Sequence, residues 1–192
     1  MSGGAARLRV AILEHGRVEG GLLKVDDFLN HRVDPGLISA IGGDIADRFH
    51  REAPDLVLTA EASGIPPALT CALDLEVPMI YAKKYLGPGD RRAFFREVMS
   101  PTRGTEYRVE VSRRALGAGL RILIVDDFLA GGRTAEALGT ITEEAACTVL
   151  GLAFVIEKTF QEGRSRLERH GWRVESLAKV TSLAGGRAVL AD

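Results

Sequence analysis

Five short apolar runs, rich in β-branched residues, recur along the chain without alternating with polar residues. They lie at Leu56–Thr59, Pro78–Ala82, Ile122–Val125, Val149–Ile156 and Val174–Leu177. Strands of this composition are usually buried on both faces, as in a parallel sheet that is covered by helices. The pattern therefore predicts five strands of a mostly parallel sheet.

Between several of these runs, apolar residues recur at helical spacing. The first such segment begins at Asp34-Pro35, a suitable N-cap followed by proline at the first helical position. Its apolar face carries Leu37, Ile38, Ile41, Ile45 and Phe49. Further helices are predicted to begin at Pro66 and at Thr134. Strands and helices in alternation predict an α/β fold with a doubly wound sheet, in which ligands bind at the carboxyl ends of the strands.

The segment from Tyr85 to Arg114 has a different composition. It contains Gly87-Pro88-Gly89, the turn sequence Pro101–Gly104 and several arginines, but little continuous apolar sequence. Such a segment is typical of a loop or hairpin beside a binding site. A solvent-exposed surface segment with no role in binding would explain its composition equally well.

Composition and charge narrow the classes of protein. The chain has 192 residues, 46% of them hydrophobic, which suits one domain with its own core, residues 1–192. With 25 basic and 26 acidic residues, the chain lacks the excess of positive charge that is typical of a nucleic-acid-binding protein. Neither a membrane span nor a signal peptide is predicted, and the cysteines lie in apolar runs. We expect a cytoplasmic protein with no nucleic-acid or membrane partner.

The strongest chemical signal follows the predicted strand Ile122–Val125. Two carboxylates, Asp126 and Asp127, come first, and the small-residue loop of Ala130, Gly131, Gly132, Arg133 and Thr134 then opens a helix. Free backbone amides at such a helix start can cradle a phosphate. The carboxylates can accept hydrogen bonds from ribose hydroxyls. The segment thus matches both halves of a ribose 5-phosphate.

Other interpretations of this segment fit less well. A glycine turn with a solvent-facing Asp126-Asp127 pair is disfavoured, because paired acids at the buried end of a strand cost free energy. The Gly-Lys-Ser/Thr of a Walker loop and the Gly-x-Gly-x-x-Gly of a dinucleotide site are both absent from it.

The segment Ile124–Thr134 resembles the phosphoribosyl pyrophosphate signature of the type I phosphoribosyltransferases. Similarity extends over most of the chain and is greatest to the bacterial enzymes of this family that use xanthine. The other matching segments are Leu23–His31, Val155–Arg164 and Val174–Ala178. The resemblance implies the type I phosphoribosyltransferase fold, with a small hood built from the N- and C-terminal segments.

A second loop, formed by Glu61, Ala62, Ser63 and Gly64, follows the predicted strand Leu56–Thr59. Its amides can form another anion site, although an ordinary strand–helix turn would have the same composition. The resemblance implies that this loop binds the pyrophosphate leaving group.

Two lysines add positive charge after the next apolar run. They are Lys83 and Lys84, which we expect to help neutralise the pyrophosphate. The family usually has Arg-Lys at this point, so a bidentate contact is lost at Lys83.

Lys158 follows a buried apolar run, where a charge needs a function or a partner. An ammonium only donates hydrogen bonds, which suits the exocyclic oxygens of an oxopurine and opposes the amino group of adenine. Pairing with Glu157 or Glu175 is the structural alternative. The resemblance assigns Leu23, Asn30 and Lys158 to the purine site, while Phe160 either stacks on the base or fills the core.

The activity that the resemblance implies is transfer of the 5-phosphoribosyl group from 5-phospho-α-D-ribose 1-diphosphate to N9 of xanthine. The expected cofactor is Mg²⁺, bound with the sugar diphosphate rather than in a protein metal site. Asp126 and Asp127 are the expected catalytic residues, and a homodimer is the expected assembly. Two alternatives stay open: an enzyme for guanine or hypoxanthine, and a non-catalytic sensor of phosphoribosyl pyrophosphate.

Overall fold

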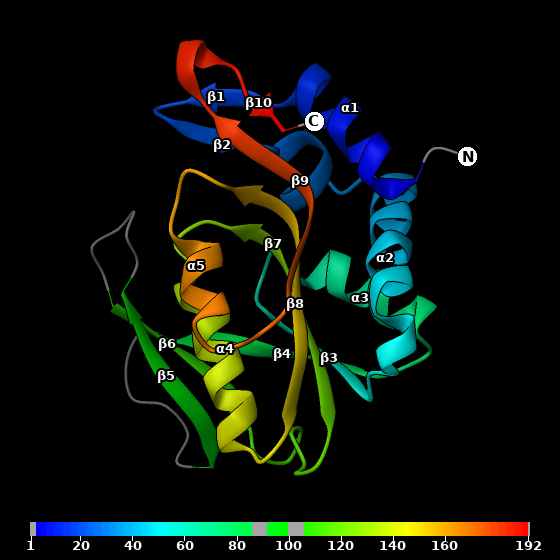
Figure 1. Cartoon of the computed structure of the whole chain (residues 1–192), viewed down its shortest axis with the longest axis vertical. Helices are drawn as coiled ribbons and strands as arrows, with labels where there is room; N and C mark the ends of the chain where they lie inside the picture. Colours follow the sequence, from blue (N-terminus) through cyan, green and yellow to red (C-terminus); the bar gives the residue numbers. More distant parts are fainter. Residues whose placement is uncertain (1–2, 86–91, 100–105, 192) are drawn as a thin grey trace.

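A computed structural model describes residues 3–85, 92–99 and 106–191 of the chain. Its main sheet has eight strands in the order β10-β9-β8-β7-β3-β4-β6-β5 (Figure 1). The strands are β3 (Leu56–Ala60), β4 (Met79–Tyr85), β5 (Ala93–Met99), β6 (Glu106–Ser112), β7 (Arg121–Leu129), β8 (Thr148–Lys158), β9 (Val174–Ser182) and β10 (Val189–Leu190). The five central strands, from β9 to β4, are parallel, and the strands at both edges are antiparallel.

All five predicted strands are present, and every residue of β3 is buried. The main difference is length. The strand predicted at Ile122–Val125 continues as β7 to Leu129, so Asp126 and Asp127 lie within the strand rather than after it. Pairing with β8 maintains this extension, since Asp126 is opposite Phe154 and Leu129 is opposite Glu157.

Helices cover both faces of the sheet, as a doubly wound fold requires. The predicted helices correspond to α2 (Pro35–Phe49), α3 (Ile65–Asp74) and α4 (Arg133–Glu144). The Asp34 carboxylate caps α2 by accepting a 2.7 Å hydrogen bond from the Leu37 amide. In Figure 1, α2 and α3 lie on one side of the sheet, and α4 with α5 (Gly163–Glu168) lies on the other.

A hood stands over one end of the sheet (Figure 1). Its parts are α1 (Gly4–His15), the hairpin of β1 (Arg17–Glu19) and β2 (Leu22–Lys24), the π-helical turn η1 (Asp26–Asn30) and, from the C-terminus, η3 (Ala184–Gly186) and β10. Because Arg9 donates a hydrogen bond to the Ala191 carbonyl, the two chain ends are joined in this unit. The implied hood is thus confirmed.

Of the two interpretations of Tyr85–Arg114, the hairpin is confirmed for the described residues. Strands β5 and β6 pair antiparallel from Ala93 to Ser112, and β6 also pairs with β4. The Gly87-Pro88-Gly89 and Pro101–Gly104 sequences lie outside the described residues. None of the helices in the described part of the chain is both long and apolar enough to cross a membrane.

Candidate active site

The loop from Ala130 to Gly132 joins β7 to the start of α4. Gly132 has φ +74°, a left-handed conformation that glycine adopts without strain. Within the described residues, the backbone amides of residues 131–135 donate no hydrogen bond. Five consecutive free amides at the start of a helix make a strong anion-binding surface.

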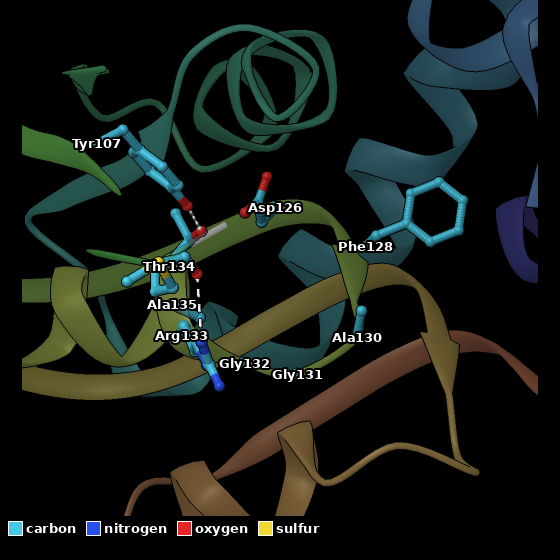
Figure 2. Close-up of a pocket in the computed structure, with 10 residues that line it drawn as sticks. Tyr107, Asp126, Phe128, Ala130, Gly131, Gly132, Arg133, Thr134 and Ala135 are labelled. Carbon is cyan, nitrogen blue, oxygen red and sulfur yellow. Dashed lines mark hydrogen bonds between the residues drawn. The ribbon is translucent and has the colours of Figure 1, made fainter. Parts of the chain in front are cut away.

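Side chains from other elements surround these amides. Figure 2 shows Tyr107 of β6 reaching Thr134, with Asp126 on the adjacent part of β7. The hydroxyls of Tyr107 and Thr134 lie 2.7 Å apart and form a hydrogen bond. Met99, Tyr107, Asp126 and Phe128 line the same hollow as residues 130–135. The hairpin therefore borders the hollow that is lined by residues 130–135.

Asp126 and Asp127 are both buried, with 9% and 8% of their surface exposed. The Asp126 carboxylate accepts a 2.9 Å hydrogen bond from the Asp127 amide. Burial, and next the charge of Asp127, raise the pKa of Asp126 well above its ordinary value, while Lys84 opposes this effect. The pair is an electrostatically costly arrangement that a ligand with hydroxyl groups or a cation would relieve.

The loop Glu61–Gly64 lies directly against this acid pair. A Cβ atom at Gly64 would stand 2.4 Å from an Asp126 carboxylate oxygen and 2.2 Å from the Thr59 hydroxyl, so only glycine fits. The Glu61 carboxylate accepts a 2.6 Å hydrogen bond from the Lys84 amide, which ties the loop to β4. The peptide bond between Glu61 and Ala62 is cis.

The two neighbouring lysines are separated by the pleat of β4, because successive side chains of a strand point to opposite faces. Lys84 lies near the acid pair, with its ammonium 5.7 Å from the centre of the Tyr107 ring. Lys83 lines a different hollow, together with Tyr81 and Tyr85 of the same strand and Glu110 of the neighbouring β6. The structure thus brings Lys84, but not Lys83, to the acid pair.

Lys158 is the last residue of β8 and is 9% exposed. Its ammonium lies 5.3 Å from the centre of the Phe128 ring. Burial lowers the pKa of Lys158, and the charge of Asp127 partly opposes this. Among the described residues, Lys158 has no ion-pair partner: Glu157 pairs with Arg164, and Glu175 pairs with Arg48 and Arg173. The alternative that Lys158 pairs with Glu157 or Glu175 is therefore wrong.

The Glu157–Arg164 pair fixes the backbone next to Lys158. The guanidinium makes two hydrogen bonds to the carboxylate, at 2.8 and 2.6 Å, and Glu157 is only 2% exposed. Burial alone would raise the pKa of Glu157, but the bonds from Arg164 and Ser176 hold it below its ordinary value. A bidentate pair of this kind has one preferred geometry, so it positions the end of β8.

Leu23 and Asn30 come from the hood. Leu23 is buried in the large apolar core cluster that also contains Ile156 and against which Phe128 packs. The Asn30 side-chain oxygen is buried and has no hydrogen-bond partner among the described residues. An unpaired buried acceptor costs free energy that a ligand donor would recover. Phe160 is 50% exposed, so it does not fill the core as one alternative expected.

Met99, Tyr107 and Phe128 border the site but were not identified from the sequence. Polar and apolar residues alternate in Glu106–Ser112, a signal that would have indicated a strand there. For Phe128 the signal was weaker, because an aromatic residue after an acid pair is equally compatible with a core position.

A model of the phosphoribosyl transferase domain matches residues 34–180, more than half of the chain. The chain belongs to this family. It is 49% identical to the xanthine phosphoribosyltransferase of Chloroflexus aurantiacus, over 90% of this chain and 82% of that protein. The enzyme of the same name from Stutzerimonas stutzeri is 45% identical, over 97% and 99% of the two chains.

Solved structures with this fold include adenine phosphoribosyltransferases. The enzyme from Saccharomyces cerevisiae, in complex with an imino-altritol bisphosphate and adenine, superposes with a TM-score of 0.75 and 27% identity. This match covers 91% of the present chain and 98% of the other. The enzyme from Rhodothermus marinus gives the same TM-score at 25% identity, over 92% and 98% of the chains. The expected type I phosphoribosyltransferase fold is confirmed.

Because Asp126 is buried, we expect the stability of the folded protein to depend on pH. In the unfolded chain Asp126 ionises near pH 4, roughly the ordinary value for this side chain, whereas its pKa in the folded protein is well above that value. Between these two pKa values the folded protein holds a proton that the unfolded chain has released, so stability falls as pH rises through this window. Asp126→Asn, which cannot ionise, should raise Tm at pH 8 by about 2–4 °C for each kcal/mol relieved.

Thermal unfolding at pH 4 and pH 8 measures this effect, and the gain should vanish near pH 4. Asp47→Asn, at an exposed position on α2, is the control and should show no gain that depends on pH. A Tm for Asp126→Asn below that of the wild type at pH 8 would contradict the interpretation.

Proposed function

We propose that this protein transfers the 5-phosphoribosyl group from 5-phospho-α-D-ribose 1-diphosphate to N9 of xanthine. The C1′–O bond breaks, its electron pair leaves with the diphosphate, and the N9–C1′ bond forms as the base loses a proton. The observation that carries the proposal is the buried acid pair between two loops suited to anions. Together, the acid pair and the two loops provide separate surfaces for the 5-phosphate, the ribose hydroxyls and the departing diphosphate.

At the sugar, the residues act by positioning and electrostatics, since the reaction needs no covalent nucleophile. The free amides of residues 131–135 bind the 5-phosphate, and Thr134 adds its hydroxyl. Asp126 and Asp127 accept hydrogen bonds from the ribose hydroxyls. The loop Glu61–Gly64 and Lys84 neutralise the charge that develops on the diphosphate. Lys83 lines the other hollow and has no role in this proposal.

At the base, Lys158 donates to an exocyclic oxygen of xanthine and Asn30 supplies an unpaired acceptor for a ring N–H. Leu23 forms part of the apolar wall of this pocket. The names of the sequence relatives, which are 42–49% identical to this chain, support xanthine over the adenine used by the structural relatives. An ammonium that only donates would oppose the amino group of adenine.

Mg²⁺ fits the oxygen donors of this site, and it would neutralise the diphosphate during its departure. Among the described residues there is no group of three His, Cys, Asp or Glu side chains that could hold an ion by itself. In our proposal the diphosphate and the ribose hydroxyls supply most of the ligands, and Asp126 and Asp127 contact the ion indirectly.

We further propose that residues 1–192 form one catalytic domain that works in the cytoplasm as a homodimer. Exposed apolar side chains on α3 and the adjacent β4 support this assembly. Leu69 and Leu73 are four residues apart and therefore share one face of α3, where they are 48% and 66% exposed, and Tyr81 of β4 is also exposed.

The first test of the function is pyrophosphate release from 5-phospho-α-D-ribose 1-diphosphate with each of four bases. Xanthine should give the highest kcat/KM, followed by guanine and hypoxanthine, with adenine last, and removal of Mg²⁺ should abolish turnover. Faster turnover of adenine than of xanthine would overturn the base assignment. Binding of the sugar diphosphate without release with any base would indicate a sensor instead of an enzyme.

The second test separates the base site from the sugar site. Lys158→Ala should raise the KM for xanthine about 10- to 100-fold, the loss expected for a hydrogen bond to a charged group. The KM for the sugar diphosphate should change by no more than about twofold, because that substrate does not contact the ammonium. Lys179→Ala removes the same charge from the exposed face of neighbouring β9 and serves as the control. Equal damage to both KM values would mean that Lys158 is structural.

The third test concerns assembly. Light scattering should give a mass of two chains for the wild type and of one chain for Leu73→Asp, because a charge in an apolar interface has no partner. Leu13→Asp makes the same change at a position of similar exposure on α1 and should remain a dimer. If only Leu13→Asp dissociates, α1 forms the interface instead of α3.

A further inference from the structure

Arg166 of α5 lies behind the phosphate loop and holds one of its peptide groups. Its Nε atom donates a 2.8 Å hydrogen bond to the carbonyl oxygen of Gly131, a residue that is 35 positions away in the sequence. The start of α5 packs tightly on the loop, since a Cβ atom at Gly163 would stand 2.2 Å from the Ala130 carbonyl oxygen. Arg166 is therefore positioned to act on the loop backbone.

The orientation of this carbonyl determines the orientation of an amide. In a trans peptide, the C=O of one residue and the N–H of the next point in opposite directions. Among the described residues the only cis bond is Glu61–Ala62, so the Gly131–Gly132 peptide is trans. With its carbonyl directed at Arg166, the Gly132 amide is directed away from α5.

That direction leads into the hollow that is lined by residues 130–135. Gly131 and Gly132 line the hollow that also contains Asp126 and Thr134, whereas Arg166 does not line it. Arg166 instead lines an adjacent groove, together with Glu97, Glu136 and Thr140. Figure 2 shows the loop at Gly131 and Gly132 passing along one side of this hollow. The guanidinium and the cradle thus lie on opposite sides of the loop.

Arg166 is itself held in place by a chain of polar side chains. Its Nη1 atom donates a 3.1 Å hydrogen bond to one carboxylate oxygen of Glu136, and the second oxygen of Glu136 is 3.0 Å from a ring nitrogen of His170. His170 stacks on the buried Trp172, with the ring centres 4.2 Å apart. Burial opposes ionisation of Glu136, but the hydrogen bonds from His170 and Arg166 keep its pKa below the ordinary value. Because both oxygens of Glu136 are bound, the guanidinium has one preferred position.

We propose that Arg166, oriented by Glu136 and His170, is a positioning residue that keeps the Gly132 amide aimed at the 5-phosphate of the sugar substrate. A glycine pair without this restraint can rotate its shared peptide, which would turn a carbonyl oxygen toward the phosphate. The arginine prevents that rotation from outside the site and without contacting the ligand. The inference rests on the proposed function, because it assigns the phosphate to this loop.

The experiment compares binding of ribose 5-phosphate and of pyrophosphate, measured by calorimetry. Arg166→Met should raise the Kd for ribose 5-phosphate about tenfold, the cost of losing one hydrogen bond to a charged group. The Kd for pyrophosphate, which our proposal assigns to the Glu61–Gly64 loop, should change by less than about twofold. The wild-type Gly132 amide resonance should shift on addition of ribose 5-phosphate, and this shift should be lost in the variant.

Arg169→Met is the matched control. It removes the same charge three residues further along, from an exposed side chain that makes no hydrogen bond among the described residues, and should bind both ligands as the wild type does. An equal loss in Arg169→Met would mean that only the overall charge matters. If Arg166→Met does not fold, Arg166→Lys replaces it. That variant keeps the charge but has a single nitrogen that cannot span both partners, so a loss of about threefold is expected.

The outcomes distinguish this inference from the function on which it rests. Absence of ribose 5-phosphate binding to the wild type would contradict the proposed function. Equal binding of ribose 5-phosphate by wild type and Arg166 variants would overturn the role of Arg166 and leave the function intact. A similar loss for both ligands would make Arg166 a general structural residue, which also overturns the inference.

Discussion

Burial of two adjacent carboxyl groups, on Asp126 and Asp127, is the constraint on which the rest of the site depends. Charges that leave water cost free energy unless nearby groups of opposite polarity compensate for them. The protein compensates incompletely, because Lys84 only partly offsets the effect of burial on the pKa of Asp126. Two features beside the pair suit further parts of a ligand: the free amides of residues 131–135, and Gly64, where the lack of a side chain lets a second loop approach. The site is therefore arranged for a ligand that brings hydroxyls, phosphates and a cation together.

The parallel sheet produces this arrangement from separate parts of the chain. Strands β3 and β7 are neighbours, so the loops that follow them open at the same edge of the sheet. Each loop leads into a helix, and α3 and α4 cover opposite faces of the sheet. One loop thus approaches the acid pair from each side. Since β7 continues through Asp126 and Asp127 to Leu129, pairing with β8 holds the carboxylates rigidly between the two loops.

Much of this arrangement could be predicted from the sequence, because buried parallel strands and glycine-rich loops leave local signals. The strand at Ile122 and the helix from Asp34 depend on patterns within a few residues. The length of β7 does not, since its last residues are extended only because β8 lies beside them. The hydrogen bond from Arg166 to the Gly131 carbonyl could not be predicted either, because it joins residues 35 positions apart and leaves no spacing pattern in the sequence. Lys83 and Lys84 were predicted to act together, yet the pleat of β4 separates them.

The division between sheet and hood explains how one fold can serve different bases. Two solved adenine phosphoribosyltransferases superpose on this chain with a TM-score of 0.75, although their sequence identity to it is only 25–27%. A shared sheet is compatible with a common sugar site, since both of the proposed anion loops arise from its strands. The proposed base contacts have another origin: Leu23 and Asn30 come from the N-terminal hood, and Lys158 from the far end of β8. Substitutions of Leu23 and Asn30, which lie on other elements than the acid pair, would change the contacts offered to a base while the strand that carries the pair stays the same. Base specificity can therefore differ between relatives while the chemistry at C1′ stays the same.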